Sequence, residues 1–248
     1  MYASKLIAVF KPANDRVAVF KPTHKTYASP AATINTPAPT SIPVIPPHDY
    51  TVPPITNGLV PVISRIPTKE QVVFLTIDDG IWTNPADAQV MLTDHVKATF
   101  FLVYRFIHNN PLFFSDLAQV TGSDIQNHSY DHYMLTNLTY LQQQQDICKN
   151  ADIFLQWYGK RPTLFRPSGG SYNTDTLRAA AACNMRALIM WDVTVNNGSL
   201  QYRTGHSLQA GDIVLMHFRL TFKEDMDAFT AAAKAANLQP ELLVDWIH

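Results

Sequence analysis

The sequence has little cysteine: Cys148 and Cys183 are the only two among 248 residues. Two cysteines exclude the dense disulfide framework of a small secreted scaffold, and neither belongs to a Cys-x-x-Cys pair of the kind used in redox and zinc-ribbon proteins. The sequence favours two buried thiols and leaves one disulfide bridge as the alternative. Neither arrangement identifies the redox compartment.

An excess of one charge is also missing. The chain has 19 Lys and Arg against 20 Asp and Glu, and it contains no long run of basic residues. A protein whose main partner is nucleic acid or an anionic membrane surface carries such a basic patch. We therefore expect no nucleic-acid partner.

Long apolar runs are absent as well. No stretch of the sequence reaches the roughly 18 to 20 apolar residues of a membrane span, so none is expected. The apolar stretch at residues 6–10 is shorter than the roughly 7 to 15 residues of a secretory signal core. No signal peptide is visible in this sequence.

Proline is concentrated in one part of the chain. Nine of the 17 prolines lie between residues 28 and 61. Because proline fixes φ and restricts the preceding residue, this segment is expected to be extended. We interpret residues 1–67 as an N-terminal extension, with a Pro-rich linker or a strap lying on a surface, and residues 68–248 as the globular domain.

From about residue 68 onward, short β-branched runs alternate with amphipathic stretches. This alternation predicts βαβ units with a parallel sheet, and about seven such strands favour a distorted (β/α) barrel over an open sheet. The chemistry of a parallel barrel gathers at the carboxyl ends of its strands. The expected strands cover residues 72–77, 98–103, 124–129, 163–167, 186–193 and 212–218, and the expected helices cover residues 84–96, 110–120, 139–158 and 174–183.

Two adjacent carboxylates, Asp78 and Asp79, end the first expected strand, although like charges repel and buried carboxylates need partners. The segment "NHSYDH" places His128 and His132 four residues apart, where a helical turn or a tight loop brings both imidazoles to one point. Two histidines and one carboxylate form a three-ligand zinc site with an open position for water. Either aspartate can be the third ligand, and the other is then placed as a general base. The alternative is an ordinary Asp-Gly turn and a chance pair among nine histidines.

Three further polar features follow expected strands. Arg166, in "FRPSGG", can pair with a carboxylate bidentately, or it forms a surface ion pair. Gly169 and Gly170 can bring backbone N–H groups close to a ligand, as an oxyanion hole requires, or they form a plain turn. His217 ends the apolar segment "VLMHF" and is a candidate general acid, with a buried structural histidine as the alternative.

The segments "TIDDG", "HSYDH", "RPSGG" and "LMH" resemble four of the five ordered motifs of NodB-like polysaccharide deacetylases, carbohydrate esterase family four. The resemblance extends from about Thr68 to His248. It implies an α/β fold, a distorted (β/α)7-type barrel, and metal-dependent removal of N-acetyl groups from an N-acetylglucosamine-containing polysaccharide such as peptidoglycan, a chitin-like polymer or an exopolysaccharide. It also implies a secreted or cell-wall-associated protein.

The resemblance assigns roles residue by residue. Asp78 would be the general base, oriented by Arg166. Zn²⁺, or another divalent transition metal, would be held by Asp79, His128 and His132. His217 would protonate the leaving amine, and the backbone N–H of Gly169 would help to hold the oxyanion.

Two motifs depart from the family pattern. Ser168 and Gly169 stand where a proline and an aromatic residue are common, and the missing ring is expected to open that part of the groove. In "WDVTVNNG", Asn197 and Gly198 stand where an Asp-Trp pair is usual. That aspartate supports the catalytic histidine in the family, so either Asp192 or Asp212 is a candidate to replace it.

Substrate contacts are expected from Gly170, Tyr172, Trp191 and Asn197, with the aromatic rings stacking on sugar faces unless they are core residues. Two other functions stay open. One is a glycan-binding pseudoenzyme that retains the metal, and the altered fourth motif favours this alternative. The other is a related metal-dependent hydrolase of a different C–N amide bond. The oligomeric state is not predicted.

Overall fold

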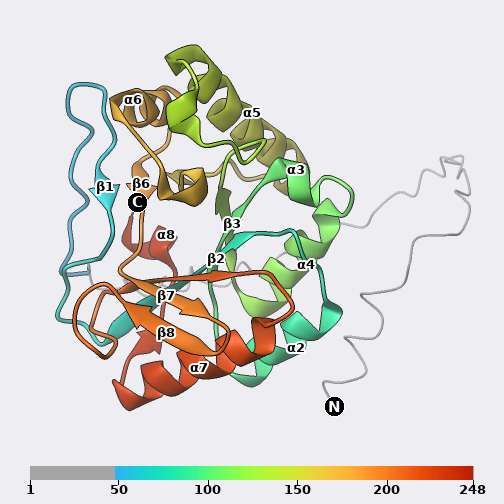
Figure 1. Cartoon of the computed structure of the whole chain (residues 1–248), viewed down its shortest axis with the longest axis vertical. Helices are drawn as coiled ribbons and strands as arrows, with labels where there is room; N and C mark the ends of the chain where they lie inside the picture. The colour runs from blue at the N-terminus through green and yellow to red at the C-terminus, as the bar shows by residue number, and fades with distance from the viewer. Residues whose placement is uncertain (1–47, 248) are drawn as a thin grey trace, which may run out of the picture. The chain divides into compact units, whose positions relative to one another are not determined.

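The structure is a computed structural model that describes residues 48–247 (Figure 1). Residues 1–47 of the predicted N-terminal extension lie outside this described part. The described strands form one curled sheet in the order β1-β6-β5-β4-β3-β2-β9-β7-β8, with β10 paired to β2. The strands are β1 Val62–Ile63, β2 Val72–Asp79, β3 Thr99–Leu102, β4 Asp124–Asn127, β5 Leu164–Phe165, β6 Ala187–Ile189, β7 Val193–Asn196, β8 Ser199–Tyr202, β9 Ile213–His217 and β10 Gln239–Pro240.

Helices surround this sheet and follow the strands in the expected alternation (Figure 1). The paired strands of the sheet are all parallel except β7 and β8, which are antiparallel. The predicted α/β fold, a distorted barrel of mostly parallel strands surrounded by helices, is confirmed. The helices are α2 Pro85–Thr93, α3 Tyr104–Ile107, α4 Pro111–Thr121, α5 Tyr140–Tyr158, α6 Thr174–Ala182, α7 Phe222–Ala235 and α8 Leu243–Trp246, with 3-10 turns η1 Leu135–Asn137 and η2 Ser168–Gly170.

Local sequence explains where the main helices begin. The side chain of Asn84 accepts a hydrogen bond from the backbone N–H of Ala86, and Pro85 occupies the first turn of α2, where no N–H is needed. Thr139 and Gln142 form a capping box at the start of α5, and Gly159 ends this helix in the left-handed conformation.

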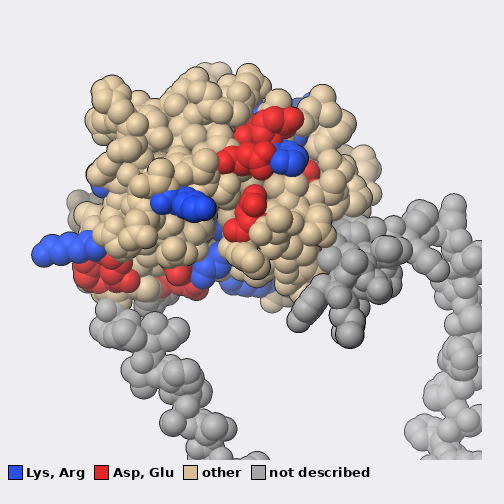
Figure 2. Space-filling view, turned by 90° about the horizontal axis from the view of Figure 1, so that it is seen from below, with Lys and Arg blue, Asp and Glu red and all other residues tan. Residues whose placement is uncertain are grey.

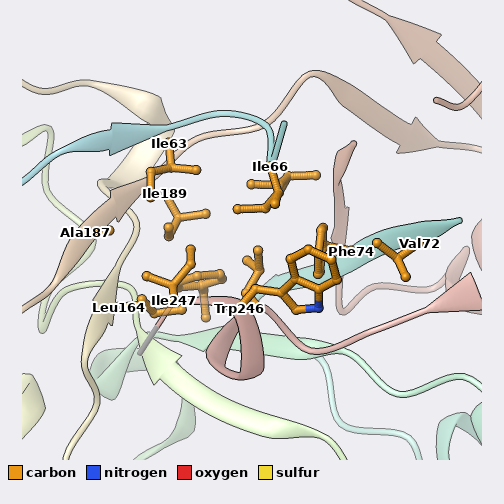
Figure 3. Close-up of a cluster of buried hydrophobic side chains, with 12 residues drawn as sticks. Ile63, Ile66, Val72, Phe74, Leu164, Ala187, Ile189, Trp246 and Ile247 are labelled. Carbon is orange, nitrogen blue, oxygen red and sulfur yellow. The ribbon is translucent and has the colours of Figure 1, made fainter. Parts of the chain in front are cut away.

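One face of β2 connects the bottom of the barrel with its carboxyl end. Side chains alternate along a strand, so Phe74, Thr76 and Asp78 lie on the same face. Phe74 packs edge-on against Trp246 of α8, with the ring centroids 5.4 Å apart, inside a cluster of buried apolar side chains (Figure 3). Asp78 stands at the other end of this face, where the apolar packing gives way to polar groups.

The described part of the predicted N-terminal extension, residues 48–67, packs on the barrel. Strand β1 pairs in parallel with β6. Ile63 and Ile66 are buried in the same apolar cluster as Trp246 (Figure 3). The ring of His48 stacks on Trp246 with the centroids 3.7 Å apart.

The expected strand 186–193 is wrong in one respect, because it is two strands at distant places in the sheet. Strand β6 pairs with β5 and β1, whereas β7 pairs with β9 and β8. Between them, the N–H of Met190 donates to Ile63 and the N–H of Asp192 donates to Ile213. The chain therefore crosses the gap that the curled sheet leaves open, and Trp191 lies at the crossing.

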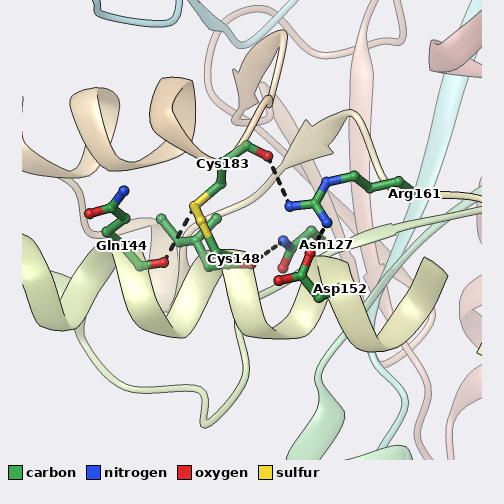
Figure 4. Close-up of a disulfide and its surroundings, with 7 residues drawn as sticks. Asn127, Gln144, Cys148, Asp152, Arg161 and Cys183 are labelled. Carbon is green, nitrogen blue, oxygen red and sulfur yellow. Dashed lines mark hydrogen bonds and ion pairs between the residues drawn. A yellow bond between two sulfur atoms is a disulfide. The ribbon is translucent and has the colours of Figure 1, made fainter. Parts of the chain in front are cut away.

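The favoured interpretation of two free thiols is also wrong. Cys148 of α5 and Cys183 at the end of α6 form a disulfide, with their Cα atoms 5.0 Å apart (Figure 4). The two helices pack directly on each other, which brings together cysteines that are 35 residues apart in sequence. Sequence spacing alone does not reveal this helix pairing.

Charges of both signs are interspersed on the face shown in Figure 2, which has no extended basic patch. None of the helices in the described part is long and apolar enough to cross a membrane.

Candidate metal and catalytic site

The predicted motifs meet in one pocket of about 260 Å³ at the carboxyl ends of the strands. We call it the metal pocket. It is lined by Asp78, Asp79, His128, His132, Pro167, Gly169, Gly170, Trp191, Leu215 and His217.

The end of β2 turns both carboxylates toward this pocket. Neighbouring side chains of a regular strand point to opposite faces, but Asp79 has a φ of 77° and breaks the alternation. Gly80 follows with a φ of 81°, and a Cβ there would lie 2.5 Å from Cγ2 of Ile107. Gly80 is therefore needed both for its backbone conformation and for the space it leaves to Ile107.

A tight loop, rather than a helical turn, carries the two histidines. The carboxylate of Asp146 in α5 accepts hydrogen bonds from the backbone N–H groups of Tyr130 and Asp131, at 2.9 and 3.1 Å. The N–H of His132 donates to Oγ of Ser129 at 3.1 Å. These bonds fix the loop backbone, and both imidazoles reach the same pocket.

Asp79, His128 and His132 form a group whose ligand atoms all lie within 4.8 Å of one another. Nε2 of His132 is 3.2 Å, and Nε2 of His128 is 3.6 Å, from Oδ1 of Asp79. Nδ1 of His128 lies 2.8 Å from the carbonyl oxygen of Arg166 and must donate its proton there, which leaves Nε2 free as a ligand. This donor set fits Zn²⁺ or a similar divalent metal.

The electrostatics of the group favour the ligand forms. Burial raises the pKa of Asp79, but the interaction with His132 and the charges of His128 and His217 outweigh it, and the net pKa lies below the ordinary value. Burial lowers the pKa of His128, and the charges of Asp78 and Asp79 offset this only in part. A carboxylate and a neutral imidazole are the forms that bind a metal.

Arg166 is fully buried and holds Asp78. Its Nη1 donates to Oδ1 of Asp78 and to Oγ1 of Thr76, both at 2.7 Å. The expected bidentate pairing is wrong, because Nε and Nη2 instead donate to the carbonyl oxygens of Ile189 and Met190 at 3.2 Å. Burial lowers the pKa of this guanidinium, and Asp78 opposes that effect.

The two glycines of the third motif let other side chains approach closely. A Cβ on Gly169 would lie 3.0 Å from Sδ of Met134, and a Cβ on Gly170 would lie 2.9 Å from the Trp191 ring. Met134 thus lies beside Gly169, where the family commonly has an aromatic ring, and the expected opening of the groove stays a prediction. Trp191 and both glycines line the metal pocket.

His217 lies at the end of β9, level with Asp78 on the neighbouring strand β2, and both side chains line the metal pocket. Its Nδ1 is buried without a hydrogen-bond partner among the described residues. Neither candidate replacement for the motif-four aspartate contacts it. Asp192 pairs with Arg203 at 3.4 Å, and Asp212 pairs with Arg65 at 3.3 Å.

Two predicted substrate contacts lie outside the lining of the metal pocket. Asn197 and Gly198, with φ angles of 51° and 67°, form the two-residue turn between β7 and β8. Asn-Gly is the preferred sequence for such a turn, so local turn chemistry explains the altered fourth motif. Tyr172 is 38% exposed and follows η2 without lining the pocket.

Sequence reasoning missed three contributors to the site: Thr76, Met134 and Leu215. Thr76 and Leu215 stand two residues before Asp78 and His217, so the alternation of strand side chains places them on the same face. That signal is available in the sequence. No comparable signal exists for Met134, whose contact with Gly169 joins two separate loops.

The chain is similar to known proteins over most of its described part. The profile of the family described as polysaccharide deacetylase matches residues 65–188. An uncharacterised protein of Streptomyces coelicolor is 37% identical over 185 residues, which are 73% of this chain and 70% of that protein. A peptidoglycan-N-acetylglucosamine deacetylase of Bacillus cereus is 26% identical, covering 72% of this chain and 84% of that enzyme.

The fold is also similar to solved structures. One is a mutant, with restored enzymatic activity, of a carbohydrate esterase family four pseudoenzyme from Bacillus anthracis. It has a TM-score of 0.65 and 24% identity, covering 75% of this chain and 71% of that one. This likeness supports the fold assignment, and the members of this fold group include proteins with and without activity.

Proposed function

We propose that this chain, which belongs to the polysaccharide deacetylase family, removes N-acetyl groups from an N-acetylglucosamine-containing polysaccharide with the help of a divalent metal, foremost zinc. One observation carries the proposal. A carboxylate held by a buried arginine stands beside an Asp-His-His group, and His217 on the neighbouring strand lines the same pocket. The peptidoglycan-N-acetylglucosamine deacetylase among the relatives supports the substrate class.

Asp79, His128 and His132 would hold the metal. When bound, the ion supplies Lewis acidity toward the acetamide carbonyl and toward water. Asp78, held by Arg166, accepts a proton from the attacking water as general base. The backbone N–H of Gly169 donates to the developing oxyanion.

His217 supplies the proton for the leaving nitrogen. Its Nδ1 is buried, so Nε2 is the atom that donates into the pocket. Thr76 has an indirect role, because its hydroxyl shares Nη1 of Arg166 with Asp78 and limits how that arginine can turn. The site thus separates a base on β2 from an acid on β9.

The test is acetate release from N-acetylglucosamine oligomers by zinc-loaded protein. We expect release by the wild type and a loss of about 10²-fold or more in Asp78→Asn, since a general base contributes roughly 10² to 10⁴ in rate. The variant should bind zinc as the wild type does. Release that persists in Asp78→Asn would refute the assigned base.

A glycan-binding pseudoenzyme is the second candidate, favoured by the unpartnered Nδ1 of His217. In that case neither form turns over, and Asp78→Asn leaves the glycan affinity unchanged. A metal-dependent hydrolase of another C–N amide bond is the third candidate. It would release no acetate from the oligomers but would cleave a small cyclic or linear amide.

We also propose that the protein works outside the cytoplasm, at or near a cell wall. The Cys148–Cys183 disulfide supports this location, because structural disulfides persist in oxidising compartments. Fractionation of cells that produce the complete protein would test it, and recovery in the cytoplasm with both thiols reduced would refute it.

A further inference from the structure

The loop that carries both histidines has a second hollow on its other side. His128 and His132 line the metal pocket. Tyr130, Asp131 and Tyr133 of the same loop line a separate pocket of about 280 Å³. The two pockets therefore share one wall and have nearly the same size.

The second pocket is polar and rigidly built. Its far side is formed by α5, which contributes Gln142, Gln145 and Lys149. Nζ of Lys149 lies 3.7 Å from the centroid of the Tyr130 ring. Asp146, which also lines this pocket, accepts hydrogen bonds from the backbone N–H groups of Tyr130 and Asp131 and so fixes the loop wall.

This mixture of groups suits a sugar unit. A hexose carries hydroxyl groups around its edge and apolar C–H groups on its faces. Amide, carboxylate and ammonium groups can bind the hydroxyls, while a partly exposed ring can pack on a face. Tyr133, which is 49% exposed, offers such a ring. A purely apolar ligand would leave the polar groups of Asp131 and Gln145 without partners.

An apolar ridge joins the two pockets. Tyr133 and Met134 are adjacent, and their side chains are 49% and 46% exposed. Tyr133 lines the second pocket. Met134 contacts Gly169, which lines the metal pocket. A chain of linked sugars that leaves the metal pocket over Gly169 therefore crosses Met134 and Tyr133 before it reaches the second pocket.

We propose that the second pocket is a sugar-binding subsite, which holds a further unit of the same polysaccharide while the Tyr133–Met134 ridge supports the chain between the pockets. This inference rests on the proposed function and narrows its substrate to chains of several linked units. A single sugar or a dimer would occupy the metal pocket without reaching this subsite.

The test compares short and long substrates on the zinc-loaded full chain. We would measure kcat/KM for acetate release from N-acetylglucosamine dimer and hexamer in wild type, Tyr133→Ala and Gln145→Ala. Losing one stacking or hydrogen-bonding contact of about 1 kcal/mol predicts a loss of roughly fivefold for the hexamer. The dimer should change by less than about twofold under the same energy argument. The matched control is Gln89→Ala on α2, which should leave both values unchanged.

Equal losses for dimer and hexamer, or no loss for either, would overturn the subsite. If the wild type releases no acetate from any oligomer, the proposed function fails, and hexamer binding then tests the subsite by itself. Calorimetric titration should then show wild-type affinity that weakens several-fold in Tyr133→Ala and Gln145→Ala. Affinity unchanged by both substitutions, or no binding by the wild type, would overturn the inference.

Discussion

The two sides of the metal pocket differ in how their polar side chains are held. On the side of β2, β4 and β5, Arg166 binds Asp78, and its own backbone carbonyl fixes the ring of His128. On the side of β9, Nδ1 of His217 has no hydrogen-bond partner among the described residues. The metal and base groups are thus preorganised by several bonds, whereas the acid is held by its strand and by packing.

This difference shows which part of the chemistry the fold secures most firmly. Ligand geometry and base orientation must both be correct before any bond breaks, and the dense network on the first side supplies them. No such network holds His217, the proposed proton donor, at its Nδ1 among the described residues. Five variants follow: two on the first side, one on the side of β9, and two at the disulfide and at Asp87, which lie outside the pocket lining.

The largest effect is expected from removing a metal ligand on the preorganised side. His128→Gln should lower zinc affinity by at least about 100-fold, more than the 10- to 100-fold typical of outer-shell changes, and should abolish acetate release. Zinc content after dialysis and the affinity from competition with a chelator would measure this. Zinc bound as tightly as in the wild type would show that His128 is not a ligand.

Arg166→Met should have the next largest effect, a loss of stability, because it leaves the Asp78 carboxylate buried without its ion pair. Breaking a buried pair on one side costs about 3 to 5 kcal/mol of unfolding free energy. Chemical denaturation would measure it. The double variant Asp78→Asn/Arg166→Met is the control, and it should recover part of the loss. Strictly additive losses would contradict a direct coupling.

Removing the disulfide tests the covalent bond between α5 and α6, the helices that follow the preorganised loops. Helices α5 and α6 follow the histidine loop and the Arg166 segment, and the Cys148–Cys183 bond joins them across 35 residues. Replacing both cysteines by alanine should cost about 3 to 4 kcal/mol by the loop-entropy relation. Denaturation of the variant and of reduced wild type should agree. A variant as stable as the oxidised wild type would show that the bond adds nothing to the packing.

His217→Gln probes the less supported side. We expect kcat to fall by about 100-fold, the lower end of the range for general acid catalysis, with zinc affinity unchanged. The low value follows from the missing partner at Nδ1. A loss above about 10⁴-fold would mean that His217 is as well preorganised as Asp78 and His128, and the two sides of the pocket would then not differ.

The same contrast explains what could be read from the sequence. Asp78, Arg166 and His217 were predictable because each follows a short apolar run, and His128 because it stands four residues before His132. Parallel strands bring their carboxyl ends together. The observed starts of α2 and α5 also agree with the expected helix ranges 84–96 and 139–158. Features that depend on pairing between distant segments were not predictable: the contact of Met134 with Gly169, the disulfide, and the division of residues 186–193 between two strands.

The smallest effect is expected at Asp87, a buried carboxylate that has, in the described part of the chain, no arginine partner of the kind that holds Asp78. Asp87 is 3% exposed, and its Oδ2 has no hydrogen-bond partner among the described residues. Burial raises the pKa of Asp87 from 3.8 to about 7. Because the folded state then binds the proton more tightly than the unfolded chain, this group makes stability fall as pH rises from about 4 to about 7.

Asp87→Asn should remove that dependence while leaving zinc binding intact. Between pH 5 and pH 8 the wild type should lose on the order of 1 to 2 kcal/mol more unfolding free energy than the variant, a value reduced from the full shift because the N-terminal dipole of α2 favours the anion. Denaturation at both pH values measures it. Identical pH slopes in the two proteins would mean that Asp87 finds a partner in solution, and that a buried carboxylate needs no arginine to be accommodated here.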